Sequence, residues 1–407
     1  MKIAFCGDIA LWRKPEKMIL EARSDEIAPG LTSVFKEANL AIGNIECPLT
    51  DSARPFWDYF PTLRAGKAAS VLLKELGISV GSLANNHIAD YGPQGLADTI
   101  SVLEAQGIAW MGAGWSPEEA RRPLVLEREG VRIGILALAQ PEISAATRLG
   151  WGAGVLEDEY ALNCMASLSK KVDIAVAYLH YGVEFSEYPT PHQLRLSRGL
   201  VEAGAKLVIG HHPHVPQGYE HYKDGFIAYS LGNFIFDMAV DPGRYSRLGL
   251  VIQADFHGNR LKDVDVLPVD TRGGVTRALP PGESEEAERY LTQLCGVLPD
   301  NKKLSEIYYF TCRNNFELYF RAFIHNIFGK GNWRQAWDLI IQQFFWPQVF
   351  ELGIDLIRFL LSGKAFEIED AREKANRDLQ GHLWKWICRV SFYLGLPLRW
   401  LPGFRIL

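Results

Sequence analysis

The chain has 407 residues, of which 48% are hydrophobic and 22% are charged, and its formal net charge is −5. This composition excludes wholesale disorder and a collagen-like fibre, and the length predicts roughly two to three domains with a sizeable core. No stretch of the sequence approaches the roughly 18–20 uninterrupted apolar residues that span a bilayer.

Residues 1–271 alternate short apolar runs typical of strands with segments of helical period. Strands are predicted at 2–6, 39–45, 78–84, 131–138, 173–179, 206–210, 225–230 and 248–256, and helices near 66–76, 92–106, 157–171 and 190–204. Runs such as 173–179 are almost wholly apolar, as expected for strands covered on both faces. The later runs follow one another without helices, which favours some antiparallel pairing. The pattern predicts an α/β layered sandwich.

The composition changes after residue 271. Residues 272–301 are rich in Gly, Pro and Glu and predict a linker with one helix. Residues 302–407 have helical period, carry 15 Lys and Arg against 10 Asp and Glu, and hold 22 of the 47 aromatic residues. A helical, aromatic-rich, basic C-terminal region is therefore predicted to follow the α/β domain.

Side chains that can bind metal follow five of the predicted strands. In chain order they are Asp8, Glu46, Asn86 with His87 and Asp90, His180 with Glu184, and the cluster His211, His212 and His214. Ligands of open α/β sheets gather outside the carboxyl ends of the strands. These side chains are therefore expected to converge, although they are far apart in the sequence.

The donor types suit a pair of divalent ions, which need anionic oxygens, one of them bridging, together with neutral imidazoles. The predicted metal ligands are Asp8, Glu46, Asn86, His180, His212 and His214. Such a pair of ions can hold a phosphoryl or carbonyl oxygen and activate water near neutral pH. His87 follows a ligand and is predicted to be the catalytic acid. Mixed oxygen and nitrogen donors accept Mn, Fe or Zn, which leaves the metal open.

Structural roles remain open for these residues taken one at a time. Asp8 could cap a helix or a turn, residues 85–87 could form a turn, and His180 could lie at the edge of the core. The cluster at 211–214 is harder to explain by packing, because three imidazoles in four residues rarely serve that purpose.

The motifs in this order resemble the CapA family of capsule and poly-γ-glutamate biosynthesis, within the calcineurin-like metallophosphoesterase superfamily. The resemblance covers about residues 1–270 and leaves the C-terminal region out. It is carried by the segments Gly7-Asp8, Asn44–Thr50, Ala84–Gly92, Gly112–Gly114, His180–Glu184, Gly210–Val215 and Tyr229–Phe234. It implies a four-layer α/β/β/α metallophosphoesterase-like sandwich, here followed by an all-α C-terminal segment, with two metal ions.

The resemblance also implies roles for single residues. It makes Glu46 the bridging carboxylate, His87 the catalytic acid, and the other five predicted ligands the remaining donors. The first motif of the superfamily is Asp-x-His, but the third position here is Ala10, so one ion lacks a ligand. Glu184 is a candidate to fill that gap or to bind substrate. Further candidates for metal or substrate contact are His211, Asn233 and Asp90.

The sequence supports two alternative hypotheses about the function. The leading hypothesis is a metal-dependent hydrolase in capsule or surface-polymer biosynthesis, which cleaves a phosphoester or an amide. The alternative is a non-catalytic, polymer-binding accessory subunit of a membrane-associated polymer synthase. The expected ligand is an anionic polymer or a phosphorylated or lipid-linked substrate.

The C-terminal region adds a prediction about location. Basic residues alternate with Trp and Phe in 302–407, so this region is expected either to bind a membrane surface or a synthase partner, or to pack on the main domain. Six cysteines without a CxxC pair, and a first strand at the N-terminus in place of a signal peptide, favour a cytoplasmic protein. If residues 302–407 bind a membrane, the protein is expected to be peripheral at its inner face. Nucleic-acid binding is not expected, because residues 1–301 are acidic.

Overall fold

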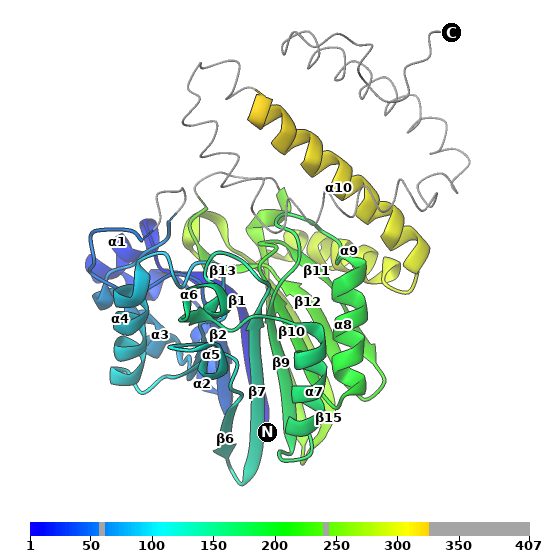
Figure 1. The fold of residues 1–407 in the computed structure, drawn as a ribbon, viewed down its shortest axis with the longest axis horizontal. Helices are drawn as coiled ribbons and strands as arrows, with labels where there is room; N and C mark the ends of the chain where they lie inside the picture. The colour runs from blue at the N-terminus through cyan, green and yellow to red at the C-terminus, as the bar shows by residue number, and fades with distance from the viewer. Residues whose placement is uncertain (57–61, 239–243, 325–407) are drawn as a thin grey trace.

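The computed structural model describes residues 1–56, 62–238 and 244–324, and its centre consists of two large sheets (Figure 1). The first sheet has eight strands. Seven of them lie in the order β16 (Arg277–Ala278), β15 (Arg260–Asp270), β14 (Leu248–His257), β1 (Lys2–Ala10), β2 (Leu40–Ile45), β3 (Val80–Ser82) and β4 (Ala109–Met111). The eighth strand, β13 (Asn233–Phe236), pairs in parallel with the end of β1, after β14 has paired with its beginning.

The second sheet has six strands, and its central strands are parallel. Their order is β11 (Pro216–Tyr222), β12 (Gly225–Leu231), β10 (Leu207–His211), β9 (Ile174–His180), β7 (Val131–Ala139) and β6 (Leu124–Arg128). A short pair, β5 (Ala113–Gly114) with β8 (Gly152–Ala153), lies apart. All eight strands predicted from the sequence are present. Antiparallel pairing occurs in this part of the chain, but through β11 and β15, which were not predicted, whereas the predicted strands β10 and β12 pair in parallel.

Helices cover the outer faces of both sheets. The α-helices are α1 (Lys14–Leu20), α2 (Thr32–Lys36), α3 (Val71–Leu76), α4 (Gly92–Ala105), α5 (Pro117–Ala120), α6 (Ala146–Leu149), α7 (Asp158–Leu168), α8 (Pro191–Glu202), α9 (Pro281–Val297) and α10 (Asn301–Ile324). Figure 1 shows α3 and α4 on one side of the sheets and α7 and α8 on the other. One buried apolar cluster includes the side chains between the sheets, and a second lies between the six-stranded sheet and α7 and α8. The four-layer α/β/β/α sandwich is confirmed.

The segment after residue 271, which was predicted to be a linker with one helix, packs against the main domain. Its helix α9 packs on β11, and Leu291, Leu294 and Val297 of α9 are buried. Cys295 accepts a hydrogen bond from the backbone N–H of Tyr219 on β11 at 3.3 Å. The helical start of the C-terminal region is α10, and residues 325–407 lie outside the described part of the chain.

Gly7 allows the chain to approach itself closely beside Asp8. A Cβ atom at Gly7 would lie 2.2 Å from the carbonyl oxygen of Gly232, which is closer than real Cβ atoms come to backbone. That carbonyl accepts the backbone N–H of Asp8 at 2.9 Å. The absence of a side chain at position 7 therefore lets β13 fix the end of β1, and with it the direction in which Asp8 points.

We expect the substitution Gly7→Ala to lower the free energy of unfolding by about 1–3 kcal/mol, because the new methyl group must displace backbone in a packed interior. Urea denaturation monitored by circular dichroism measures the change. Gly282→Ala is the control, because a Cβ atom there meets no atom within 4 Å. Equal stabilities of the two variants would contradict this packing argument.

Candidate metal centre

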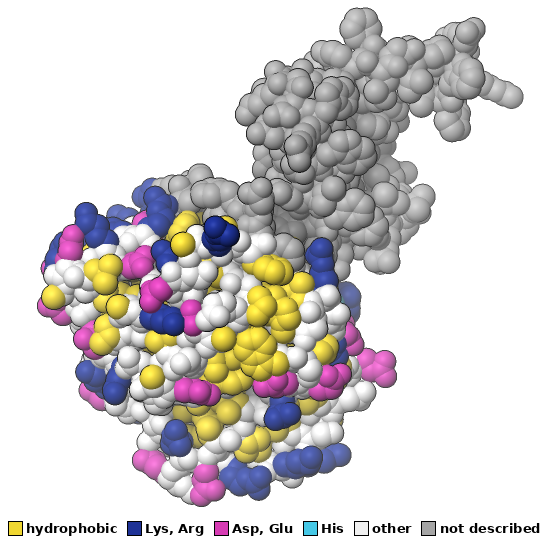
Figure 2. Space-filling view, turned by 60° about the vertical axis from the view of Figure 1, so that its left-hand side comes forward, with side chains coloured by type: hydrophobic (Ala, Val, Ile, Leu, Met, Phe, Trp, Pro, Cys, Tyr) yellow, Lys and Arg dark blue, Asp and Glu magenta, His cyan; other side chains and the backbone are white. Residues whose placement is uncertain are grey.

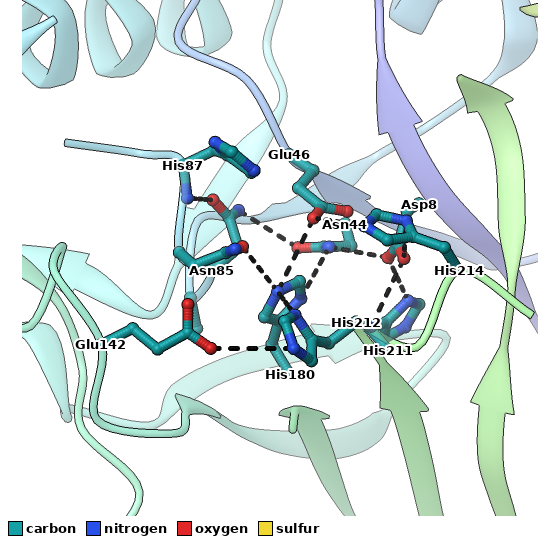
Figure 3. A network of polar contacts seen from close by, with 12 residues as sticks. Asp8, Asn44, Glu46, Asn85, His87, Glu142, His180, His211, His212 and His214 are labelled. Carbon is teal, nitrogen blue, oxygen red and sulfur yellow. Dashed lines mark hydrogen bonds and ion pairs between the residues drawn. The ribbon is translucent and has the colours of Figure 1, made fainter. Parts of the chain in front are cut away.

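The predicted site residues lie together at the carboxyl ends of strands from both sheets. Asp8 is on β1 and Glu46 follows β2, in the eight-stranded sheet, whereas His180 ends β9 and His212 follows β10, in the six-stranded sheet. Figure 3 shows these side chains pointing toward one another across the gap between the sheets. All four are 2% exposed or less, so the sandwich removes them almost completely from water.

Two groups of three side chains are close enough to hold one ion each. The first is Asp8, Glu46 and His214, named here the His214 position, and the second is Glu46, His180 and His212, named the His180 position. Within each group the donor atoms lie within 4.8 Å of one another. Oε1 of Glu46 lies 3.6 Å from Nε2 of His214 and 3.7 Å from Nε2 of His180. One carboxylate oxygen therefore faces both positions.

Asn86 adds a donor to the His180 position. Its side-chain oxygen lies 2.9 Å from Nε2 of His180, and Nδ1 of His212 lies 3.1 Å from the same nitrogen. An ion with bonds of about 2.0–2.2 Å has neighbouring ligands roughly 3–3.5 Å apart. The two separations from Nε2 of His180 to Asn86 and His212 are close to that range, and Oε1 of Glu46 is slightly farther away at 3.7 Å, so small shifts would bring these donors to one ion.

Glu46 provides the clearest test of whether metal fits. Both oxygens of its buried carboxylate lack a hydrogen-bond partner among the described residues. Burial, followed by the charge of Asp8, raises the pKa of Glu46 well above its ordinary value. A buried carboxylate without a partner is costly, and a cation removes that cost. The residues present therefore fit a pair of divalent ions.

Asp8 is held in one orientation by three donors. Nδ1 of His211 and Nδ2 of Asn44 both lie 2.8 Å from Oδ1 of Asp8. The backbone N–H of His212 donates to Oδ2 at 3.3 Å. Burial alone would raise the pKa of Asp8, but the hydrogen bond and the charges of nearby histidines lower it below its ordinary value. Oδ1 accepts two hydrogen bonds and Oδ2 only one, so Oδ2 is the oxygen with room to face the His214 position.

Burial favours the neutral form of His180 and His212, which is the form that metal binding requires. Burial lowers the pKa of His180 well below its ordinary value, and the neighbouring His212 adds to the shift. Burial likewise lowers the pKa of His212 to about 4. His212 and His214 also adopt positive φ angles of 98° and 57°, which costs about 1–3 kcal/mol each in a non-glycine residue. The surrounding contacts hold this strained turn in place.

The lowered pKa of His212 predicts a pH dependence of stability in the metal-free protein. Its pKa is about 4 when folded and about 6.5 when unfolded, so the stability it contributes is complete above about pH 6.5. That contribution, roughly 3 kcal/mol, is lost as the pH falls from about 6.5 to about 4. Denaturation in EDTA across this range should show a steeper loss in the parent protein than in His212→Gln. The difference isolates His212, because the other buried groups of the centre, among them His180 and Glu46, are present in both proteins. Identical slopes would contradict the prediction.

His87 lies beside the two positions and is oriented by Asp90. Nδ1 of His87 lies 2.8 Å from Oδ2 of Asp90, which also accepts the backbone N–H of Leu63 at 2.6 Å. Burial alone would lower the pKa of His87, but the Asp90 carboxylate outweighs it, so the pKa is raised. A protonated imidazole near the centre can donate a proton to a leaving group. Asp90 therefore acts on His87 and not on either metal position.

The remaining candidates occupy supporting places. His211 contacts Asp8 through Nδ1, and its ring packs against Tyr178 with centroids 4.5 Å apart. Asn233 accepts a hydrogen bond from Nδ1 of His214 at 2.9 Å, which leaves Nε2 of His214 facing Glu46. Glu184 is partly exposed and belongs to neither group of donors.

Three residues of the site were not predicted from the sequence. Asn44 lies within a buried strand and donates to Asp8. Gln140 and Glu142 follow β7, and the amide of Gln140 lies 3.2 Å from Nε2 of His212 and donates to Glu142 at 2.6 Å. Oε1 of Glu142 lies 3.7 Å from Nε2 of His212. The signal for Gln140 and Glu142 was the carboxyl end of the fourth predicted strand, which carries polar residues as the other strand ends do.

Two buried donor groups that share one carboxylate, at the strand ends of a four-layer sandwich, define a protein with a candidate two-metal centre. The chain belongs to the family of bacterial capsule synthesis proteins PGA_cap, whose family model matches residues 2–238. The matched range includes every predicted ligand and ends before α9.

Named relatives agree with this family. The chain is 31% identical over 274 residues to the PGA biosynthesis protein CapA of Bacillus subtilis (strain 168), covering 66% of this chain and 71% of the relative. It is 30% identical over 292 residues to the capsule biosynthesis protein CapA of Bacillus anthracis, covering 69% and 70%. A probable polyglutamine synthesis accessory protein of Mycobacterium tuberculosis is 32% identical over 171 residues, covering 39% and 45%.

Similarities to solved structures are more distant. A hypothetical protein from Thermus thermophilus is 15% identical with a TM-score of 0.44, covering 66% of this chain and 99% of the other. A 5'-nucleotidase precursor from the same organism is 16% identical with a TM-score of 0.40, covering 73% and 59%. Among the residues that the structure describes, none of the helices has both the length and the apolarity needed to cross a membrane.

Proposed function

We propose that the protein is a metal-dependent hydrolase that acts in the synthesis or remodelling of a capsule or another surface polymer. The observation that carries the proposal is the buried carboxylate of Glu46, which has no hydrogen-bond partner among the described residues and faces both donor groups. Membership of the capsule synthesis family supplies the biological setting. The bond that is cleaved is a phosphoester or an amide.

The chemistry is divided between the ions and the chain. Two bound divalent ions would polarise the substrate oxygen and lower the pKa of a water molecule. His87 supplies the proton for the leaving group, and Asp90 orients the imidazole and raises its pKa. The sandwich excludes bulk water from the donors, which strengthens every charge interaction there.

The substrate is proposed to be an anionic polymer, or a phosphorylated or lipid-linked precursor, engaged mainly at the centre itself. On the face drawn in Figure 2, Lys and Arg are interspersed with Asp and Glu around a band of apolar side chains. This face offers an anionic chain no continuous basic track. The proposed contact of residues 302–407 with a membrane or a synthase partner falls mainly on residues 325–407, which lie outside the described residues.

Metal-stripped and metal-loaded protein should be compared on phosphomonoesters, phosphodiesters and γ-glutamyl amides, with Mn²⁺ or Zn²⁺ as the added ion. We expect one substrate class to be hydrolysed only after metal is returned. Asp8→Ala and His180→Ala are expected to lose this turnover, whereas His192→Ala, an exposed histidine on α8, is expected to keep it. Full activity in both site variants would overturn the proposal.

A second candidate function is supported by Ala10. This buried residue stands two positions after Asp8, where the superfamily motif implies a histidine ligand, so the chain has a sparser donor set. A centre weakened in this way could serve an accessory subunit that binds polymer without cleaving it, and one relative carries the name of an accessory protein. Polymer binding that survives metal removal, without turnover of any substrate class, would favour this alternative.

A further inference from the structure

The two positions of the centre differ in the number of donors that the described chain supplies. The His180 position has four, because Asn86 joins the carboxylate of Glu46 and the two imidazoles, and its side-chain oxygen is 2.9 Å from Nε2 of His180. Four protein donors complete the coordination that structural zinc sites show. An ion at this position would need few ligands from outside the protein.

The His214 position has three donors, and the polar groups of Asp8 and Asn233 beside it are already engaged. In the Asp8 carboxylate, Oδ1 accepts from both His211 and Asn44, and Oδ2 accepts only the backbone N–H of His212, so Oδ2 is the oxygen with room for an ion. The side-chain oxygen of Asn233 accepts from Nδ1 of His214 at 2.9 Å. Ala10, two residues after Asp8, offers no donor atom. Among the described residues, therefore, no fourth side chain completes this position.

We propose that the two positions bind metal unequally. The His180 position takes the first divalent ion tightly, and the His214 position takes a second ion that exchanges readily with the surroundings. The second ion completes its coordination with water or with an oxygen of the substrate. The His214 position is then the one where an oxygen of the substrate binds to metal. This part of the inference rests on the proposed function.

Electrostatics favour the same order. Both ions share the carboxylate of Glu46, so the first ion reduces the negative charge available to the second. The ion that arrives second also experiences the repulsion of the first at short range. This repulsion weakens metal binding most at the position with fewer donors. Donor number and charge therefore act in the same direction.

The test is a titration of the metal-stripped full chain with Mn²⁺, in which electron paramagnetic resonance measures free aqueous Mn²⁺ and thus the bound fraction. We expect two steps whose dissociation constants differ at least tenfold. His214→Ala should lose the weaker step and keep the tighter one. Asn86→Ala should weaken the tighter step, whereas Asn163→Ala, on α7 and away from the centre, should change neither.

Two results would overturn the inference: two steps of equal affinity in the parent protein, or loss of the tight step in His214→Ala while the variant remains folded by circular dichroism. A second readout follows the order of loading, because the exchange-coupled signal of an ion pair should appear only after the first equivalent is bound. No substrate is present in these titrations. Failure to find turnover therefore leaves them valid, and equal affinities would leave the hydrolase proposal standing.

Discussion

Replacing Glu46 with glutamine is expected to remove metal binding at both positions and to lower metal-dependent turnover by about 10²–10³-fold, which is what removing one key charge stabiliser costs an enzyme. The reason is geometric, because Oε1 of Glu46 lies 3.6 Å and 3.7 Å from the nitrogens that face the two positions. An amide oxygen is neutral and bridges two cations poorly. Metal content after dialysis, measured by mass spectrometry, and turnover under saturating Mn²⁺ check the prediction.

Although Glu46→Gln removes metal binding, it should increase the stability of the metal-free protein. Burial and the nearby Asp8 raise the pKa of Glu46, so its contribution to stability is complete below its ordinary pKa and is lost as the pH rises through the raised value. Glutamine carries no such charge, so Glu46→Gln is expected to stabilise the metal-free protein by about 1–3 kcal/mol, and by more at pH 8 than at pH 5. Calorimetry in EDTA measures this gain.

Glu75→Gln on α3 is the matched control, because Glu75 is exposed and distant from the centre in the fold. It should bind metal as the parent protein does and show no gain in metal-free stability. A Glu46→Gln variant that binds two ions with the affinities of the parent protein would show that the carboxylate does not join the two positions.

Replacing His87 with glutamine is expected to reduce the turnover number by about 10²–10⁴-fold while leaving metal content unchanged. His87 belongs to neither donor group, and its Nδ1 bonds to Asp90, so its loss removes a proton donor and no ligand. Asp90→Asn is expected to reduce turnover less. It should also move the alkaline limb of the pH profile to lower pH, because the carboxylate is what raises the pKa of His87.

The shift of the alkaline limb separates a positioning role from a merely structural one, because a folding defect lowers activity at every pH without moving the profile. Metal content of Asp90→Asn provides the control. If that variant lost an ion, Asp90 would be a ligand, contrary to the contacts in which both His87 and the backbone of Leu63 bond to it.

Much of this arrangement could be predicted because strand ends and donor residues are local features of a sequence. An apolar run that ends in Gly7-Asp8, or in the residues before His211, shows both where a strand stops and what chemistry follows. The parallel order of the strands then brings the ends together. The four-layer architecture came from the resemblance, because periodicity alone indicates layers but not how many sheets form them.

Other parts depend on contacts that no local pattern reveals. Strand β13 pairs with β1 because Gly7 and Gly249 leave room for residues 232–233, which is visible only in three dimensions. Asn44 bonds to Asp8, which lies on another strand, so the sequence did not show this contact. The only sign of a role for Asn44 was a polar residue inside an apolar run. Gln140 and Glu142 follow the fourth predicted strand, whose end was not counted among the donor-bearing ones, although the same rule applied to it.

The donors of each position come from both sheets of the sandwich. The distance between the sheets therefore determines how far apart the donors lie. Phe5 of β1 and Tyr178 of β9 stack between the sheets with centroids 6.3 Å apart, and Tyr178 in turn packs against the ring of His211. A change of side-chain volume there would alter the separation of the donors within each position without replacing a ligand. Exchange of these interior aromatic residues is therefore expected to change metal affinity as well as folding stability.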